Sequence, residues 1–332
     1  MSIAIRSFAK INLGLKIGPA RPDGFHDLRT IYQTIALHDE VRVEVRTGEG
    51  IEIRCGDPRV PRDSSNTCYK IAERVLKTAK VHSKVVIEIE KRLPVQGGLG
   101  AASSNAVAAM IGLELALGIT LAPQDKLRIA AEVGSDLPLF LIGGTVLGVD
   151  RGQEVYALQD LPETAVVVVT PPVGVSTPRA FAQWDALIAR GGELTAAAAI
   201  GKMKMFDQAV YAWLSESFLS QARPEEEPAS GVPARGGDRA ETPLLDLVRT
   251  GIENDFERVV FPEYPELREV KSVLQREGAR YASLAGSGST LYGLFDSVGD
   301  AEAAAERMRA AGHAAVATRT LTRAEYWKRL GN

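Results

Sequence analysis

Residues 94–105 read Pro-Val-Gln-Gly-Gly-Leu-Gly-Ala-Ala-Ser-Ser-Asn and join a predicted strand, 84–90, to a predicted helix, 103–117. The first N–H groups of a helix have no partner within it, and the helix dipole adds positive potential at that end. Glycines let the backbone approach an anion closely, while Ser103 and Ser104 can cap the helix or contact a phosphate. The three glycines with this role are Gly97, Gly98 and Gly100. This stretch therefore predicts a phosphate site.

Two common nucleotide-binding motifs do not account for this loop. The Walker pattern ends in Gly-Lys-Ser/Thr, and the loop contains no lysine. The dinucleotide fingerprint starts with Gly98-Leu-Gly100, but Ser103 stands where a third Gly or Ala is expected. The strand before the loop is also amphipathic, unlike the buried first strand of a dinucleotide-binding unit. A dinucleotide-dependent dehydrogenase is therefore the least favoured function, and an ordinary glycine turn is the structural alternative.

Outward from the loop, strands and helices are mixed, which predicts the α+β class and two domains. In the first domain, residues 1–160, β-branched stretches predict strands and apolar residues at helical spacing predict helices. The strands are 3–17, 28–36, 41–46, 51–54, 84–90, 144–149 and 154–158, and the helices are 66–79, 103–117 and 123–133.

The second predicted domain, residues 161–332, opens with the Val-rich run 165–170, which is typical of a strand buried on both faces. Further strands and helices follow it. The strands are 279–284, 290–295 and 313–320, and the helical segments lie within 178–220 and at 266–277 and 300–311. Residues 221–241 contain three Pro, three Gly and many charges with little to bury, which predicts a flexible insertion.

Composition excludes several classes of protein. The 332 residues carry 39 Lys+Arg against 42 Asp+Glu, so no basic surface for nucleic acid or a membrane is expected. Two cysteines are too few for a disulfide framework, and four scattered histidines argue against a zinc site. No segment reads as a signal peptide or a bilayer-spanning helix. We expect a soluble cytoplasmic protein, monomer or homodimer, with small-molecule partners.

Two charged residues are candidates for catalysis. Asp136, in Gly-Ser-Asp-Leu-Pro, is either a helix N-cap or a carboxylate that accepts a proton from a substrate hydroxyl. Lys10 lies in an apolar, strand-like stretch, and most such lysines extend to the surface. A strand lysine beside a carboxylate would instead keep that group ionised and stabilise developing phosphoryl charge.

Two turns offer weaker signals. Phe25 and His26 follow an Asp-Gly turn and place an aromatic face beside a ring with hydrogen-bonding edges. This is one way to hold a nucleobase, and a solvent-facing hairpin turn is the alternative. Residues 285–289, Ala-Gly-Ser-Gly-Ser, form a glycine-rich turn between two predicted strands.

Three segments, taken in chain order, resemble the signature segments of the GHMP kinases. They are Ser7-Phe-Ala-Lys-Ile-Asn12, the loop that starts at Pro94, and Gly286-Ser-Gly-Ser289. This family phosphorylates small-molecule hydroxyls with ATP. The similarity covers residues 6–150 and 250–296. It implies a two-domain fold with the active site in the cleft between an N-terminal domain like ribosomal protein S5 domain 2 and a ferredoxin-like C-terminal domain.

The resemblance also implies roles for the candidate residues. Asp136 would be the base, Lys10 its charged partner, and Asn12 a contact for the erythritol end of a substrate. Three further motifs are similar to those of the family members that act on a CDP-linked methylerythritol, namely Asp23-Gly-Phe-His-Asp27, Ser103-Ser-Asn105 and Asp136-Leu-Pro138. They imply a reaction that moves the γ-phosphoryl of ATP onto the 2-hydroxyl of that substrate, a step of isoprenoid precursor synthesis. The alternatives are another GHMP kinase, acting on homoserine or a mevalonate-type acid, and a non-catalytic nucleotide-binding paralogue.

The same resemblance places the two nucleotide ends of the site. Phe25 and His26 would take the cytosine, with Phe181 as a second stacking face, although relatives usually carry Tyr at the position of Phe25. ATP is implied as the phosphoryl donor, and Mg²⁺ would arrive with it on no identified protein ligand. The implied ATP contacts are Asn66, Pro94, Gly97, Gly98, Leu99, Gly100, Ala101, Ala102, Ser103 and Ser104. Relatives usually have glycines at Ala101 and Ala102, where a methyl group would crowd the phosphates if the residue required a positive φ.

Overall fold

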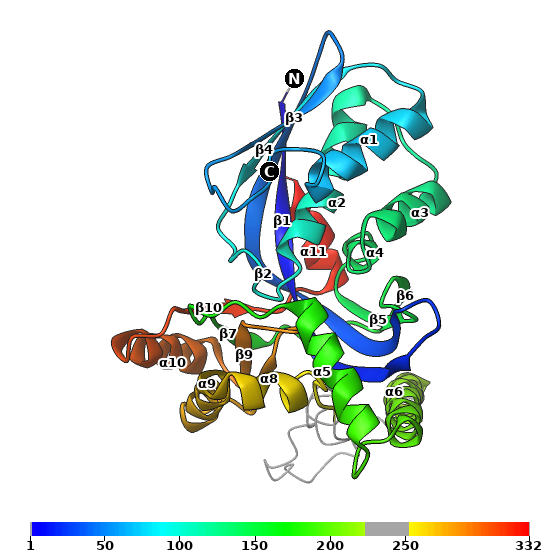
Figure 1. Ribbon diagram of the computed structural model, residues 1–332. Coiled ribbons are helices and arrows are strands. Elements are labelled where there is room, and N and C mark those ends of the chain that lie inside the picture. The colour runs from blue at the N-terminus through cyan, green and yellow to red at the C-terminus, as the bar shows by residue number, and fades with distance from the viewer. Residues whose placement is uncertain (1, 223–251, 332) are drawn as a thin grey trace.

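The computed structural model describes residues 2–222 and 252–331, and within them the strands form one six-stranded and one four-stranded sheet. Of the predicted insertion at 221–241, all but the first two residues lie outside the described part. Figure 1 shows the sheets as the centres of two units, one above the other. This arrangement confirms the predicted α+β class.

The first sheet has the order β3-β4-β2-β5-β6, with β1 paired to β2. Its strands are β1 (Ser2–Ala20), β2 (His26–Arg46), β3 (Gly50–Cys55), β4 (Lys84–Glu90), β5 (Thr145–Val149) and β6 (Glu154–Ala157). Strands predicted separately at 28–36 and 41–46 are two parts of the single strand β2. Its residues 30–33 pair with β5 and its residues 40–46 pair with β4, so the polar break in the sequence marks a change of partner.

Helices complete the first unit, and most of their apolar faces join one core with the sheet. They are α1 (Thr67–Ala79), α2 (Ala101–Leu117), α3 (Pro123–Val133), α4 (Leu137–Phe140) and α11 (Arg323–Leu330). The last of these was not predicted, and it buries Tyr326 and Leu330 in the core of the first unit. Helix α11 therefore packs in the core of the first unit, although it belongs by sequence to the proposed 161–332 domain.

The second sheet has the order β10-β7-β9-β8, with every pair antiparallel. Its strands are β7 (Ala165–Val169), β8 (Tyr281–Leu284), β9 (Leu291–Phe295) and β10 (Ala315–Arg319). Helices occupy the connections from β7 to β8 and from β9 to β10, which gives the ferredoxin-like βαββαβ pattern. They are α5 (Thr177–Arg190), α6 (Ala196–Ala222), α8 (Glu257–Glu263), α9 (Pro265–Arg276) and α10 (Val298–Ala310).

Strand β7 joins two cores, as its Val-rich sequence predicted. Val167 and Val169 pack into the helix-covered core of the second unit, whereas Val166 and Val168 pack into a third core with residues of β1. The third core includes Ile11 from the middle of β1. Figure 1 shows the long β1–β2 ribbon reaching from the first unit down to α5 and α6. The ribbon thus places the residues of β1 at the junction of the two units.

Candidate active site

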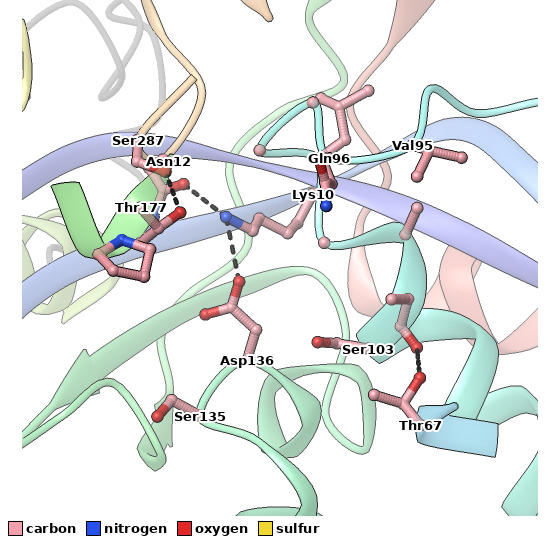
Figure 2. Close-up of a pocket in the computed structure, with 18 of the residues that line it drawn as sticks. Lys10, Asn12, Thr67, Val95, Gln96, Ser103, Ser135, Asp136, Thr177 and Ser287 are labelled. Atoms are coloured by element: carbon pink, nitrogen blue, oxygen red, sulfur yellow. Dashed lines mark hydrogen bonds and ion pairs between the residues drawn. The ribbon is translucent and has the colours of Figure 1, made fainter. Parts of the chain in front are cut away.

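A cavity of about 940 Å³ lies at this junction, and it brings together segments from both units. Residues from β1, the 94–100 loop, the start of α2, the turn before α4, α5 and the 285–289 turn line it. Every residue that the sequence analysis assigned to the site lines the cavity, with the exception of Ser104. Figure 2 shows the central part of this cavity.

Lys10 and Asp136 form an ion pair inside the cavity. The Lys10 side chain is 3% exposed, and its Nζ lies 3.3 Å from Asp136 Oδ2. The same Nζ donates a hydrogen bond of 2.8 Å to Asn12 Oδ1, so Lys10 lies between these two residues (Figure 2). Asn12 is held in turn, because its Nδ2 donates to Thr30 Oγ1 at 2.8 Å. Lys10 therefore does not extend to the surface, and its charge is fixed beside the carboxylate.

The helix-cap alternative for Asp136 does not describe what its side chain does. Asp136 stands at the N-cap position of α4, but its side chain accepts no cap hydrogen bond. About a third of the side chain is exposed, on the cavity side. The carboxylate is therefore accessible to a molecule in the cavity while Lys10 contacts it from within the protein.

Tyr32 is a member of this cluster that sequence reasoning missed. Its hydroxyl donates to Asp136 Oδ1 at 3.1 Å, and Lys10 Nζ lies 5.5 Å from its ring centre. Burial raises the pKa of the Tyr32 phenol, so the hydroxyl keeps its proton and serves as the donor. In the sequence Tyr32 is one apolar-facing residue of a strand, and nothing in that pattern distinguishes it from a core aromatic.

The predicted phosphate loop, residues 94–100, has the backbone that its glycines predicted. Gly98 and Gly100 both have positive φ, and Lys10 N donates to Leu99 O at 3.0 Å, which ties the loop to β1. Gly100 is the N-cap of α2 and supplies no side-chain cap, so the first N–H groups of the helix are available to a ligand. A negatively charged group in the cavity can therefore bind at this end of α2.

Helix α2 begins two residues earlier than the sequence predicted. Ala101 and Ala102 are consequently its first helical residues, and neither has a positive φ. The condition under which their methyl groups would crowd a phosphate is therefore not met. Ser103 lines the cavity, and Figure 2 shows its hydroxyl pointing to the side where Asp136 lies. Ser104 is buried instead, with its Oγ 2.8 Å from Ser7 Oγ.

The weak glycine-rich signal at 285–289 proves to be part of the same site. This turn packs directly on the phosphate loop, because a Cβ at Gly98 would overlap the Ala285 carbonyl oxygen. Gly286 and Ser287 line the cavity, and Ser287 Oγ forms a 2.6 Å hydrogen bond with Thr177 Oγ1 at the start of α5. The second unit thus closes over the loop through this turn.

Aromatic residues gather at one end of the cavity. The rings of His26 and Phe181 are stacked, with 4.7 Å between centroids and 17° between planes. His26 Nε2 also lies 2.8 Å from Asp185 Oδ1, one turn after Phe181 on α5. Phe25 is 49% exposed, and the Arg151 guanidinium covers its ring at 4.6 Å. The structure therefore brings His26 and Phe181 into contact, and gives Phe25 a different neighbour.

Asn66 lines the cavity from the opposite side, but its side chain is committed to the protein. It is the N-cap of α1, where its Oδ1 accepts from Cys68 N and its Nδ2 donates to the Pro61 carbonyl. The next residue, Thr67, donates its hydroxyl proton to the Ala102 carbonyl at 2.8 Å. Asn66 therefore shapes this wall by fixing the start of α1 against α2.

The described residues contain neither a metal-binding cluster nor a membrane-spanning helix. Across 2–222 and 252–331, no three His, Cys, Asp or Glu side chains gather so that they could hold a metal ion by themselves. The helices in the same part of the chain include no apolar stretch suited to spanning a bilayer.

Comparisons with known proteins agree with this geometry. The family model for the GHMP kinases N terminal domain matches residues 66–144, and the model for the GHMP kinases C terminal region matches residues 241–314. The 4-diphosphocytidyl-2-C-methyl-D-erythritol kinase of Solibacter usitatus is 34% identical over 88% of this chain and 80% of its own. The kinase of the same name from Geobacter sulfurreducens is 33% identical over 96% of this chain and 99% of its own.

Solved structures show the same similarity. A crystal structure of 4-(cytidine 5'-diphospho)-2C-methyl-D-erythritol kinase matches with a TM-score of 0.70 and 26% identity, over 96% of this chain and 98% of its own. Homoserine kinase from Cytophaga hutchinsonii matches with a TM-score of 0.69 and 20% identity, over 97% and 95% of the two chains. The second match concerns the fold alone. Three signature segments surround one cavity, and both family models and relatives that match over most of their length are GHMP kinases. The chain therefore belongs to the GHMP kinase family.

Proposed function

We propose that this kinase transfers the γ-phosphoryl group of ATP to the 2-hydroxyl of 4-diphosphocytidyl-2-C-methyl-D-erythritol. The observation that carries the proposal is the Lys10–Asp136 pair, which lies in the cavity between Ser103 at the start of α2 and Thr177 at the start of α5 (Figure 2). A hydroxyl placed there has a base on one side and a phosphate site on the other. The relatives that match over most of this chain act, by name, on the same substrate.

Asp136 would act as the general base. Its exposed carboxylate accepts the hydroxyl proton as that oxygen bonds to the γ-phosphorus, and the bond from phosphorus to the β–γ bridging oxygen breaks to release ADP. Tyr32 and Lys10 hold the two carboxylate oxygens, so the base cannot rotate away from the acceptor. The Lys10 charge also stabilises the negative charge of the phosphoryl group in transfer.

The nucleotide phosphates would bind at the start of α2. The N–H groups of its first turn and the two glycines of positive φ offer backbone donors without a bulky side chain in the way. Catalysis of phosphoryl transfer depends mainly on positioning the reactants and on stabilising charge. The loop is tied to β1 through Leu99, and this contributes to positioning.

Mg²⁺ fits this site as an ion that arrives with the nucleotide. Mg²⁺ in such sites uses one or two protein oxygens together with phosphate oxygens and waters. The cavity offers the Ser103 hydroxyl as an oxygen donor, and no closed set of acidic ligands exists among the described residues. When bound, the ion would neutralise part of the phosphate charge.

The cytidine would bind at the aromatic end. His26 and Phe181 stack on each other, and a planar base can add to such a stack from the cavity side. Asp185 fixes the His26 ring through Nε2. Homoserine and mevalonate carry no nucleobase that could stack on these rings. The aromatic faces therefore favour the cytidine-linked substrate over the substrates of the alternative GHMP kinases.

The identity of the product tests this proposal. Incubation with Mg·ATP and the cytidine-linked substrate should yield ADP and a product heavier by one phosphoryl group, measured by mass spectrometry. Homoserine and mevalonate, tested in parallel, should give no phosphorylated product. Phosphorylation of either acid in place of the cytidine-linked substrate would contradict the assignment.

A further inference from the structure

Asn254 is a buried amide that lies just outside the cavity and contacts the 285–289 turn. It is 2% exposed and does not line the cavity. Its Nδ2 donates two hydrogen bonds, to the carbonyl oxygens of Leu284 at 2.8 Å and Gly286 at 2.7 Å. Its Oδ1 accepts from Phe256 N at 3.0 Å, which fixes the orientation of the amide. Both Nδ2 protons are therefore committed to the end of β8 and the turn that follows.

These hydrogen bonds decide which way the peptide group between Gly286 and Ser287 faces. In a trans peptide the C=O and the N–H point in opposite directions. The Gly286 carbonyl points to Asn254, so the Ser287 N–H points away from Asn254. Among the described residues, no acceptor is hydrogen-bonded to that N–H. Gly286 and Ser287 line the cavity and Asn254 does not, so the side of the peptide away from Asn254, where we expect the N–H, is the cavity side.

The peptide lies against the groups that handle the phosphoryl transfer. A Cβ built on Gly286 would lie 3.4 Å from Lys10 Nζ, 3.6 Å from Asn12 Oδ1 and 3.4 Å from the Gly98 carbonyl oxygen. A negatively charged group beside Lys10 would therefore lie next to Gly286, whose peptide bond to Ser287 carries this N–H. A preorganised backbone donor at such a position is the arrangement that stabilises developing charge.

Asn254 is itself positioned by the strand that carries Lys10. Leu15 N donates to Glu253 O at 3.0 Å, and Asp255 N donates to Leu15 O at 2.9 Å. Leu15 is on β1, only three residues after Asn12. One short chain of backbone contacts thus connects β1, Asn254 and the Gly286 carbonyl.

We propose that Asn254 is a positioning residue that turns the Ser287 N–H toward the phosphoryl group in transfer. This inference rests on the proposed function. It adds a donor from the second unit to those at the start of α2, and Asn254 supplies the direction of that donor without touching the substrate.

Replacing Asn254 by Asp tests the idea, because the two side chains have the same shape but Asp presents oxygen where Asn presents N–H. A carboxylate facing the Leu284 and Gly286 carbonyls is repulsive, and it favours the flipped peptide with its N–H toward residue 254. We expect Asn254→Asp to lower kcat about 100-fold, the scale of one lost donor to developing charge, with KM for the cytidine substrate within about threefold. Asn254→Ala, which removes the donors without repulsion, should fall between Asp and wild type.

A second readout separates positioning from stability. The affinity for Mg·ADP with beryllium fluoride, a γ-phosphoryl mimic, should drop in Asn254→Asp by at least tenfold relative to the affinity for Mg·ADP alone. The control is Glu257→Gln, since Glu257 Oε1 accepts from Ser283 Oγ and Leu284 N on the same strand without contacting Gly286. This control should lower the melting temperature while kcat and the mimic affinity stay unchanged.

The outcomes distinguish the two proposals. If the wild-type protein does not phosphorylate the cytidine substrate, the proposed function is overturned. The affinity for Mg·ADP with beryllium fluoride would still test the role of Asn254. A folded Asn254→Asp or Asn254→Ala variant with wild-type kcat and mimic affinity would overturn the role of Asn254. Parallel losses of kcat and stability in the Asn254 variants and in Glu257→Gln would also overturn it, because they would indicate a structural effect alone.

Discussion

The Lys10 ammonium and the Asp136 carboxylate lie 3.3 Å apart, with Lys10 contributed by a strand and Asp136 by the turn before a short helix. Tyr32 donates to the second oxygen of Asp136, so both oxygens of the carboxylate have a partner. This arrangement leaves the base fixed in orientation and still open to the cavity. The proposed role of Asp136 as the general base depends on this arrangement.

Asp136→Asn removes the base while keeping the size of the side chain. We expect kcat to fall by about 10²–10⁴, the usual contribution of a positioned general base. KM for ATP and for the cytidine substrate should change only a few-fold, because Asp136 lies between the two nucleotide ends. Steady-state kinetics on a variant with a normal circular dichroism spectrum would check this. A kcat within about tenfold of wild type would show that another group takes the proton.

Lys10→Met keeps the length of the side chain and removes its charge. The variant should lose at least about 100-fold in kcat, because Lys10 both holds Asp136 and faces the phosphoryl group. Lys84→Met is the matched control, since Lys84 forms an exposed ion pair with Glu52 at 3.2 Å. Exposed pairs contribute little, so the control should retain full activity and stability. Equal losses in the two variants would contradict a role for Lys10 in the reaction.

Phe181→Ala should weaken the binding of the cytidine end. Stacking of a base on an aromatic side chain contributes about 1–3 kcal/mol, so KM for the cytidine substrate should rise about 5- to 150-fold with little change in kcat. Phe25→Tyr, which keeps the ring, should leave both constants near wild type. Titration with CDP by calorimetry gives an independent value. Unchanged CDP affinity in Phe181→Ala would place the base elsewhere.

Gly98→Ala and Ala102→Gly make a matched pair on the phosphate loop. Gly98 has a φ of +80°, and a Cβ there would overlap the Ala285 carbonyl, so Gly98→Ala should lose most activity through a displaced loop. Ala102 is an exposed residue in the first turn of α2, so Ala102→Gly should keep kcat within about threefold and cost at most about 1 kcal/mol of stability. Kinetics and urea denaturation would check both. A large gain in kcat for Ala102→Gly would mean that its methyl group does crowd the phosphates.

Cys68, the second residue of α1, lines the cavity, and burial raises the pKa of its thiol to about 12. At pH 8 only a very small fraction of the thiol would then be the reactive thiolate. Iodoacetamide should therefore leave Cys68 unmodified in the folded protein and alkylate it after unfolding in urea, as peptide mass spectrometry would show. Because the thiol pKa is raised, reactivity in the folded state should increase as the pH rises toward 12. Rapid alkylation of the folded protein at pH 8 would contradict the burial of this side chain.

The sequence contained most of the information about the site because its signals are local. Glycines before a helix predict the phosphate loop whatever packs around it, and the short motifs with Lys10, Asp136 and His26 each stand at a turn or in a strand. Their meeting in one cavity depends on the fold, which the resemblance to GHMP kinases supplied. Three expectations stay predictions: the oligomeric state (monomer or homodimer), the cytoplasmic location, and the domain boundary at residue 160.

What the sequence did not reveal depends on long-range contacts. Helix α11 is short and rich in charge, and it is stabilised by burying Tyr326 and Leu330 against the first unit. Strand β2 reads as two strands because it changes partners in the middle. Tyr32 and Asn254 act through hydrogen bonds to residues distant in the chain, and no local pattern indicates such partners.

The most direct test is ADP release by the purified protein with Mg·ATP, measured with and without 4-diphosphocytidyl-2-C-methyl-D-erythritol. ADP release should depend on the substrate, and it should be lost in Asp136→Asn by about 10²–10⁴ in kcat. ADP release that does not depend on the substrate, or that is absent although CDP binds, would contradict the proposed function.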